Sequence, residues 1–166
     1  MKSRSFGFTI ALIVFALDQL AKWFVSGPLS LEAVGQIVLV PIFNLTWTEN
    51  NGISLGLLNA TTEVGRWMLV ALTSAIAIGV AVWLGREKNR WDQAALGMIL
   101  GGALGNILDR ARHGYVVDFA DLHFGAFRPF LVFNVGDAAI SIGVVILLLR
   151  AFLMRTEEPK ETAEHA

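Results

Sequence analysis

The stretch FGFTIALIVFALDQLAKWFV, residues 6–25, is an almost unbroken apolar segment. A helix that crosses a bilayer needs about 20 mostly apolar residues, and this segment has that length. Lys2 and Arg4 precede it, as in a secretory signal peptide. However, the segment is longer than the apolar part of such a peptide, contains Asp18 and lacks an A-x-A cleavage site. We therefore interpret it as a retained membrane anchor.

Three further apolar stretches complete the pattern of a membrane protein. They cover residues 66–84, 93–108 and 130–152, and the second of them is short and rich in glycine. The pattern predicts an all-α integral membrane protein with four transmembrane helices. Between the first two spans, the alternating residues 36–40 predict a short β-strand, and residues 109–129 predict a small periplasmic loop. We expect one membrane domain over residues 1–155 and a disordered cytoplasmic tail over residues 156–166.

The distribution of positive charge predicts the orientation of the spans. Cytoplasmic loops of membrane proteins carry an excess of lysine and arginine. Such residues precede the first span, lie in the short connection between spans two and three, and follow at the end of the last span. They are Lys2, Arg4, Arg86, Lys88, Arg90, Arg150, Arg155 and Lys160. Residues 26–65, in contrast, contain no lysine or arginine. We therefore expect a multi-pass protein with both termini in the cytoplasm and the two longer loops outside.

Composition excludes several kinds of chemistry. Cysteine is absent, so the chain has no disulfide, no thiolate metal ligand and no cysteine nucleophile. The only histidines are His113, His123 and His165, and they lack the spacing of a zinc site. The net charge of −1 comes without a basic stripe interleaved with aromatic residues. We expect no metal, no cofactor and no nucleic-acid partner.

Glycine recurs every fourth residue in the third span, at Gly97, Gly101 and Gly105. This spacing forms a ridge of small residues on one helix face, which allows another helix to approach closely. Because glycine has no side chain, we interpret the ridge as structural.

Polar residues of separate segments fall at one depth, near the outer surface. Charged groups in a bilayer are costly and usually have a function. The predicted topology places polar residues from several segments at the same depth near the outer surface. They are Asp18, Lys22, Asn106, Asp109, Arg110, Asp118, Asn134 and Asp137. Each also has a structural interpretation. Asp18 and Lys22 are spaced i, i+4 and can pair as structural support, and Asp109 with Arg110 can be an interfacial charge pair. Asp121 and His123 have no supporting polar candidates of this kind, and we expect them to be solvated.

Paired carboxylates are the strongest catalytic candidates in this set. Two nearby aspartates cannot both ionise easily, so they share one proton. The ionised acid can take a proton from water while the protonated acid polarises a peptide carbonyl, which is hydrolysis without a covalent intermediate. Two alternatives stay open. A small proton-coupled transporter also needs buried acids, although the inner halves of these spans are almost purely apolar, and a non-enzymatic assembly subunit would need only the glycine ridge.

Five blocks of the sequence resemble the lipoprotein signal peptidase family, also called signal peptidase II. In order they are Asp18-Gln19-x-x-Lys22, Asn50-x-Gly52, Asn106-x-x-Asp109-Arg110, Val116-Val117-Asp118-Phe119 and Phe133-Asn134-Val135-Gly136-Asp137. The resemblance implies an aspartyl protease of the bacterial plasma (inner) membrane, with Asp118 and Asp137 as its catalytic pair near the outer face. It implies that Asn50, Gly52, Asn106, Arg110 and Asn134 position substrate or the pair, and that Asp18, Lys22 and Asp109 are supports.

The same resemblance implies the partners. Family substrates are prolipoproteins that carry diacylglycerol on a cysteine and are cut just before it, and the family is the target of the antibiotic globomycin. We expect the chain to act as a monomer in membrane lipid. The chain departs from the family pattern after Asn50-x-Gly52, where it reads Ile53-Ser54-Leu55-Gly56, and at Gly136, where alanine is more usual. Residues 26–65 are expected to form a lid or platform on the membrane surface.

Overall fold

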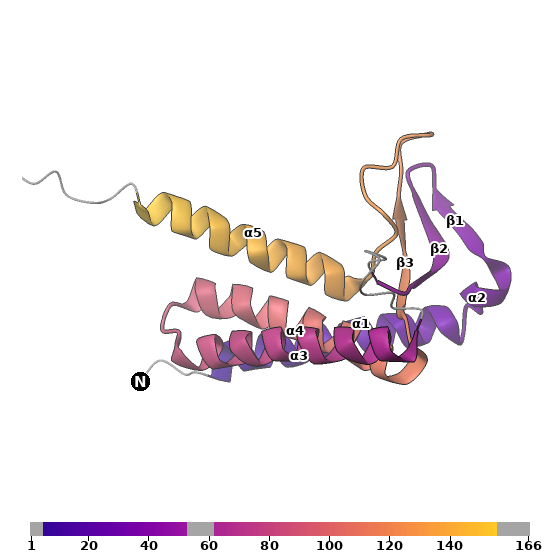
Figure 1. Cartoon of the computed structure of the whole chain (residues 1–166). Helices are drawn as coiled ribbons and strands as arrows, with labels where there is room; N and C mark the ends of the chain where they lie inside the picture. The colour runs from indigo at the N-terminus through magenta and orange to yellow at the C-terminus, as the bar shows by residue number, and fades with distance from the viewer. Residues whose placement is uncertain (1–4, 53–61, 156–166) are drawn as a thin grey trace, which may run out of the picture.

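The computed structural model describes residues 5–52 and 62–155 of the 166-residue chain. Within the described part, four long helices pack together, and a small sheet stands at the end of the bundle remote from the N-terminus (Figure 1). In chain order the elements are α1 (Ser5–Ser26), α2 (Leu31–Val34), β1 (Gln36–Val40), β2 (Phe43–Asn50), α3 (Glu63–Arg86), α4 (Arg90–His113), β3 (Val116–Leu122) and α5 (Val135–Arg155). The expected tail, residues 156–166, and residues 53–61 lie outside the described part.

Three helices within the described part are long and apolar enough to cross a membrane. They are α1, α3 and the Val135–Leu153 portion of α5. Their side chains are largely exposed in the isolated chain, as expected for helices that face lipid. The chain is thus mostly helical, with membrane-spanning segments where three of the four apolar stretches predicted them.

Helix α4 is the central helix and has a different composition. It packs against α1, α3 and α5. Its buried residues include glycines and the polar Gln93, Asn106 and Asp109, which explains why it is less apolar than its neighbours. The prediction of residues 93–108 was too short. The Asn89 side chain caps the helix by accepting from Trp91 N at 2.9 Å, and Gly114, with φ of 93°, ends it.

The glycine ridge brings α1 and α4 into backbone contact, as predicted. A Cβ on Gly97 would collide with the carbonyl oxygen of Gly7, and a Cβ on Gly101 with that of Ala11. A second face of α4, which the sequence analysis did not identify, approaches α5 in the same way. A Cβ on Gly102 would collide with the carbonyl oxygen of Gly136. Small residues therefore set the spacing of both helix pairs.

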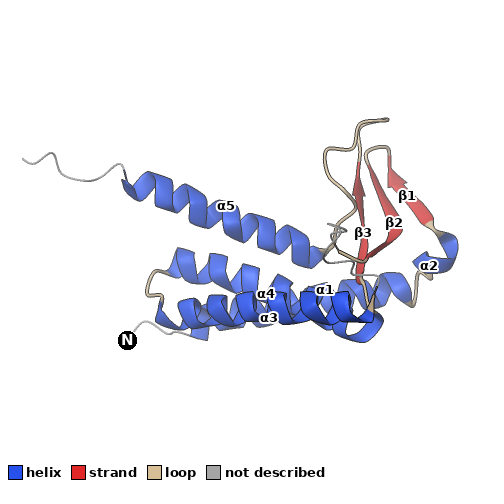
Figure 2. Cartoon of the chain, viewed as in Figure 1, coloured by secondary structure: helices blue, strands red, loops and turns tan. Residues whose placement is uncertain are grey.

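The three strands form one antiparallel sheet in the order β1-β2-β3 (Figure 2). The predicted strand at residues 36–40 is confirmed as β1. The connection at residues 109–129, predicted as a small periplasmic loop, contains regular structure that the sequence did not reveal: α4 continues to His113, and β3 then pairs with β2 from Asn50↔Val116 to Phe43↔Leu122. Phe119 and Val117 pack with Val25 of α1 and Leu31 of α2, so an apolar cluster fastens the sheet to the bundle.

Helix α5 begins at Val135 rather than at residue 130. The side-chain oxygen of Asn134 accepts from Asp137 N at 2.8 Å, and the Asp137 carboxylate accepts from Asn134 N at 3.4 Å. This reciprocal pair is a capping box, which defines the start of the helix. The apolar residues before it instead lie beside β3, where Phe133 forms a bridge with Ala120.

Candidate active site

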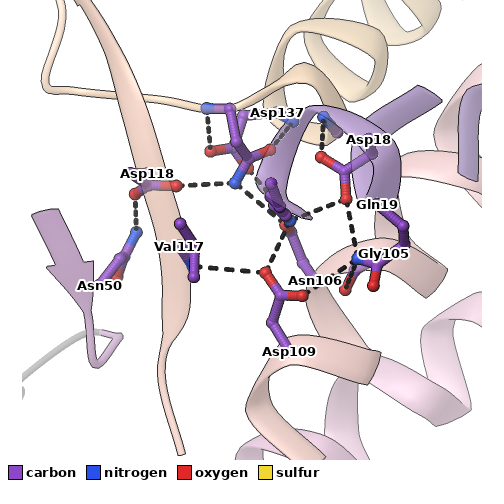
Figure 3. Close-up of polar contacts among 12 residues, drawn as sticks. Asp18, Gln19, Asn50, Gly105, Asn106, Asp109, Val117, Asp118 and Asp137 are labelled. Atoms are coloured by element: carbon purple, nitrogen blue, oxygen red, sulfur yellow. Dashed lines mark hydrogen bonds and ion pairs between the residues drawn. The ribbon is translucent and has the colours of Figure 1, made fainter. Parts of the chain in front are cut away.

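Four separate elements bring polar side chains together where the bundle meets the sheet (Figure 3). Asp137 lies in the first turn of α5, Asp118 lies on β3, Asn106 on α4 and Asn50 at the end of β2. These residues are far apart in the sequence. The structure therefore brings these polar residues together, from a sheet as well as from helices.

Asn134 joins the two acids. Its Nδ2 donates to Asp118 Oδ1 at 2.6 Å, while its backbone N–H and side-chain oxygen form the capping box with Asp137. The capping residue of α5 thus holds one carboxyl through its amide nitrogen and the other through the start of the helix. This arrangement keeps Asp118 and Asp137 next to each other.

Asp118 is almost completely buried, at 1% exposure. Its second oxygen, Oδ2, accepts from Asn50 Nδ2 at 3.0 Å. Gly52 N donates in turn to Asn50 Oδ1 at 2.9 Å, which orients the asparagine. Gly52 has a φ of 92°, a left-handed conformation that glycine adopts without strain. The Asn50-x-Gly52 block therefore serves to hold Asp118.

Burial, and after it the neighbouring Asp137 carboxylate, raise the pKa of Asp118 from its ordinary 3.8 to about 6. Hydrogen bonds from Asn50 and Asn134 and the charge of Lys22 act the opposite way, without cancelling the effect. A carboxyl with this pKa holds its proton near neutral pH more readily than a solvated aspartate does.

We expect the Asp118→Asn substitution to change the pH dependence of stability. Because the folded-state pKa is raised, the contribution of Asp118 to folding is fully present below pH 4 and is lost as the pH rises through about 6. Asparagine does not titrate, so the melting temperature of the variant should rise relative to wild type between pH 4 and pH 7. The two-unit shift corresponds to about 3 kcal/mol. Melting in detergent across this range measures the difference, and a difference independent of pH would contradict the assignment.

A second polar cluster lies behind the acids and contains the predicted supports. Lys22 Nζ is 2.7 Å from Asp18 Oδ2 and 2.7 Å from Asp109 Oδ2. The predicted pairing of Asp18 with Lys22 is thus present. Asp18 Oδ1 also accepts from Gly136 N at 2.8 Å, and Asp109 Oδ2 accepts from Val117 N at 3.3 Å. The cluster therefore ties α1 and α4 to the start of α5 and to β3.

The positive charge of Arg110 lies beside the acids. Its half-buried guanidinium interacts electrostatically with the carboxylates of Asp137, Asp118 and Asp109. Nevertheless, its Nε is buried without a hydrogen-bond partner, and it forms no ion pair with any residue that the structure describes. The structural alternative for these two residues, a charge pair between Asp109 and Arg110, is not formed, because the Asp109 carboxylate pairs with Lys22 instead.

Two expectations about the outer segment are corrected. Asp121, expected to be solvated, is 1% exposed; it accepts from Thr46 Oγ1 at 3.0 Å and pairs with Arg128 at 3.2 Å. The Nε2 of His123 is also buried. Both lie beside the unpredicted pairing of β2 with β3, which covers them. Gln19 was missed as a member of the site, although its Nε2 donates to Asp109 Oδ1 at 3.0 Å; its place next to Asp18 in the first block was the available signal.

An apolar groove leads away from Asp137. It has a volume of about 360 Å³ and is lined by Phe130, Phe133, Asp137, Ala138, Ser141 and Ile142. Phe130 and Ile142 are more than half exposed. The half-buried Asp137 therefore lines a groove whose apolar rim is exposed in the isolated chain. Among residues 5–52 and 62–155, no group of three or more histidine, aspartate or glutamate side chains is arranged to hold a metal ion.

Apolar spanning helices with adjoining carboxyls at one end define the class as a helical membrane enzyme. The model of the family Signal peptidase (SPase) II matches residues 10–153, so the chain belongs to the signal peptidase II family. It is 58% identical to the lipoprotein signal peptidase of Sphingopyxis alaskensis over 90% of this chain and 86% of the relative. It is 54% identical to that of Rhizorhabdus wittichii over 98% and 93%, respectively.

The fold agrees with solved structures. A bacterial membrane enzyme determined by the in meso method is 28% identical, with a TM-score of 0.76, over 96% of this chain and 94% of that one. The chain is therefore a protease of the family that processes lipoprotein precursors. The transporter and assembly-subunit alternatives are set aside by this membership.

Proposed function

We propose that the chain is an aspartyl endopeptidase that removes signal peptides from diacylglyceryl-modified prolipoproteins, cutting on the amino side of the lipidated cysteine. Asp118 and Asp137 are its catalytic pair. The observation that carries this proposal is the double role of Asn134, which binds the carboxyl of Asp118 and caps the helix that presents Asp137. Gln19 also joins two acids, Asp18 and Asp109, but Lys22 forms ion pairs with both of those carboxylates.

The chemistry follows from two carboxyls that share one proton. The ionised carboxyl takes a proton from a water molecule, and that water attacks the carbonyl carbon of the scissile peptide. The protonated carboxyl donates its proton to the carbonyl oxygen, which gives a tetrahedral diol. The carboxyl that took the proton from water then gives it to the leaving amine as the C–N bond breaks, and the other carboxyl recovers a proton from a diol hydroxyl, which restores the pair. The pair titrates as a unit, so the roles belong to the pair. Three asparagines support the dyad, because their side-chain amide nitrogens donate hydrogen bonds to the acids; they are Asn50, Asn106 and Asn134.

The substrate is held in the membrane by its signal peptide and its lipid. The groove beside Asp137 supports an approach from the lipid along α5, because its walls are apolar and its rim is exposed. With α4 as the fourth span, the positive residues between α3 and α4 mark the cytoplasmic side. The acids then lie at the outer face, where the scissile bond meets water.

The sheet is proposed as a platform that lies on the outer face of the plasma membrane. Large apolar side chains are exposed on β1 and on the segment after β3; they are Val38, Leu39, Val40, Phe124, Phe127, Phe130 and Leu131. Such a cluster is unusual on a surface that faces water.

Arg110 is proposed to bind the substrate. Because its guanidinium forms no ion pair with the described residues, Arg110→Gln should leave the fold intact and lower kcat/KM by about 10- to 100-fold, the value of one or two hydrogen bonds to a charged group. Arg112→Gln, two residues later on the exposed side of α4, is the matched control and should cleave normally. Equal activity of the two variants would contradict the assignment.

The substrate assignment is tested with the purified protein and two precursors that differ only in the diacylglyceryl group on the cysteine. We expect cleavage of the modified precursor, a new N-terminus at the lipidated cysteine, and inhibition by globomycin. Equal cleavage of the unmodified precursor, or a cut elsewhere, would refute the proposed substrate.

A further inference from the structure

The ammonium of Lys22 is buried directly behind the catalytic pair. Lys22 is 4% exposed, and its Nζ contacts the carboxylates of Asp18 and Asp109 and the Oδ1 of Asn106, the last at 3.0 Å. These three acceptors use the three hydrogens of the ammonium. Lys22 therefore has no hydrogen left for a substrate, and any effect it has on the reaction must pass through its neighbours.

Lys22 determines the orientation of the side-chain amide of Asn106. An ammonium is only a donor, so the atom that faces it must be the amide oxygen. The amide nitrogen of Asn106 then points the other way and donates to Asp137 Oδ1 at 2.8 Å. The reversed amide would place its NH₂ group against the ammonium and its oxygen against the carboxyl of Asp137, with a repulsive contact at each end.

The orientation of Asn106 also constrains Asn134. The oxygen of Asn106 that faces Lys22 accepts a second hydrogen bond, from Asn134 Nδ2 at 3.1 Å. The same Nδ2 donates to Asp118 Oδ1. A chain of directed hydrogen bonds thus runs from Lys22 to both catalytic carboxyls.

We propose that Lys22 is a positioning residue for peptide cleavage, acting through the amide of Asn106 rather than only as a charge partner of Asp18 and Asp109. By holding the Asn106 amide in one orientation, it keeps an N–H directed at Asp137 and keeps Asn134 between the two acids. This inference rests on the proposed function, because it gives Asp137 and Asp118 the catalytic roles stated there.

The test is a double-mutant cycle that keeps the buried charge constant. Lys22→Met alone would leave two carboxylates without a cation, so it is combined with Asp109→Asn, and the pair of changes is made in wild type and in Asn106→Leu. Activity on a diacylglyceryl-modified precursor is divided by the active fraction, titrated with a tight-binding inhibitor. In the wild-type background we expect kcat to fall about 10- to 100-fold with KM unchanged, the effect of a misplaced catalytic group.

In the Asn106→Leu background, the same two changes should alter kcat less than about threefold, because the amide through which Lys22 acts is already gone. An equal loss in both backgrounds would overturn the proposal and leave Lys22 as a charge partner. Arg150→Met is the control for loss of an ion pair between helices, since Arg150 Nε of α5 is 2.6 Å from Asp92 Oδ1 of α4, a partly buried pair away from the acids. It should retain wild-type kcat.

A further variant keeps the proposal falsifiable if the combined changes prevent folding. Asn106→Asp leaves an oxygen facing Lys22 but removes the N–H that Asp137 accepts. We expect the same loss of kcat, and wild-type cleavage by this protein would overturn the proposal. Failure of the proposed function is distinguishable, because it would show as cleavage by Asp118→Asn or Asp137→Asn proteins.

Discussion

Gly101→Val should prevent the chain from forming its helix bundle. A Cβ at this position would collide with the carbonyl oxygen of Ala11 and lie 2.8 Å from the Cβ of Val14, and neither can move without displacing α1. Overpacking of this kind costs about 1–3 kcal/mol, and more when backbone atoms must shift. Because α1 carries Asp18 and Lys22, its displacement also separates the cluster behind the acids. We expect a melting temperature well below that of wild type and no cleavage.

Gly79→Val is the matched control for that substitution. Gly79 lies in the middle of α3, and a Cβ there would meet nothing within 4 Å. The same change of residue in a similar helix should therefore leave the melting temperature in detergent close to that of wild type. If Gly101→Val melts like Gly79→Val, close packing of α1 against α4 does not stabilise the bundle.

The helices could be predicted because the bilayer imposes a length and a composition on them. Residues 6–25 were predicted as a span, and α1 covers Ser5–Ser26; residues 66–84 lie within α3 at Glu63–Arg86. The glycine spacing in α4 predicted close packing because backbone approach requires a residue without a side chain. These are local properties, visible in a short window of sequence.

The sheet was largely missed because its pairing is not local. β3 contains Asp118 and Asp121 among apolar residues, so it lacks a clear alternation, and its partner β2 lies about seventy residues earlier in the chain. The burial of Asp121 depends on Thr46 and Arg128, which its own surroundings in the sequence do not reveal. Likewise, the apolar residues after Pro129 extend the hydrophobic run, whereas the capping box of Asn134 starts the helix.

The identity of the acids could be proposed from the sequence, but their arrangement could not. The blocks that resemble signal peptidase II named Asp118 and Asp137. They did not reveal that the amide of Asn134 contacts the carboxyl of Asp118 while its oxygen caps α5. That contact depends on where β3 passes the start of α5, which is a property of the whole fold.

Asp118→Asn and Asp137→Asn should each abolish cleavage, with a loss on the order of a thousandfold or more, the contribution of general acid–base catalysis. Asparagine has nearly the size of aspartate and can still accept a hydrogen bond, but it can neither take a proton from water nor give one to the peptide. The fold should survive both changes, because the apolar cluster around Phe119 and Leu31 is untouched.

Asp121→Asn provides a matched control on the same strand. Asp121 is as buried as Asp118, but its partners are Thr46 and Arg128 rather than the second acid. Removal of its charge tests whether any buried acid of β3 is needed. We expect cleavage per folded molecule to remain within a few-fold of wild type, since general acid–base catalysis requires only the pair.

The most direct measurement is cleavage of a purified diacylglyceryl-modified prolipoprotein by the wild-type, Asp118→Asn, Asp137→Asn and Asp121→Asn proteins in detergent, each normalised to its folded fraction. The account predicts that wild type and Asp121→Asn release the signal peptide while the two dyad variants, folded, do not. Near-wild-type cleavage by a folded Asp118→Asn or Asp137→Asn protein would contradict the aspartyl mechanism.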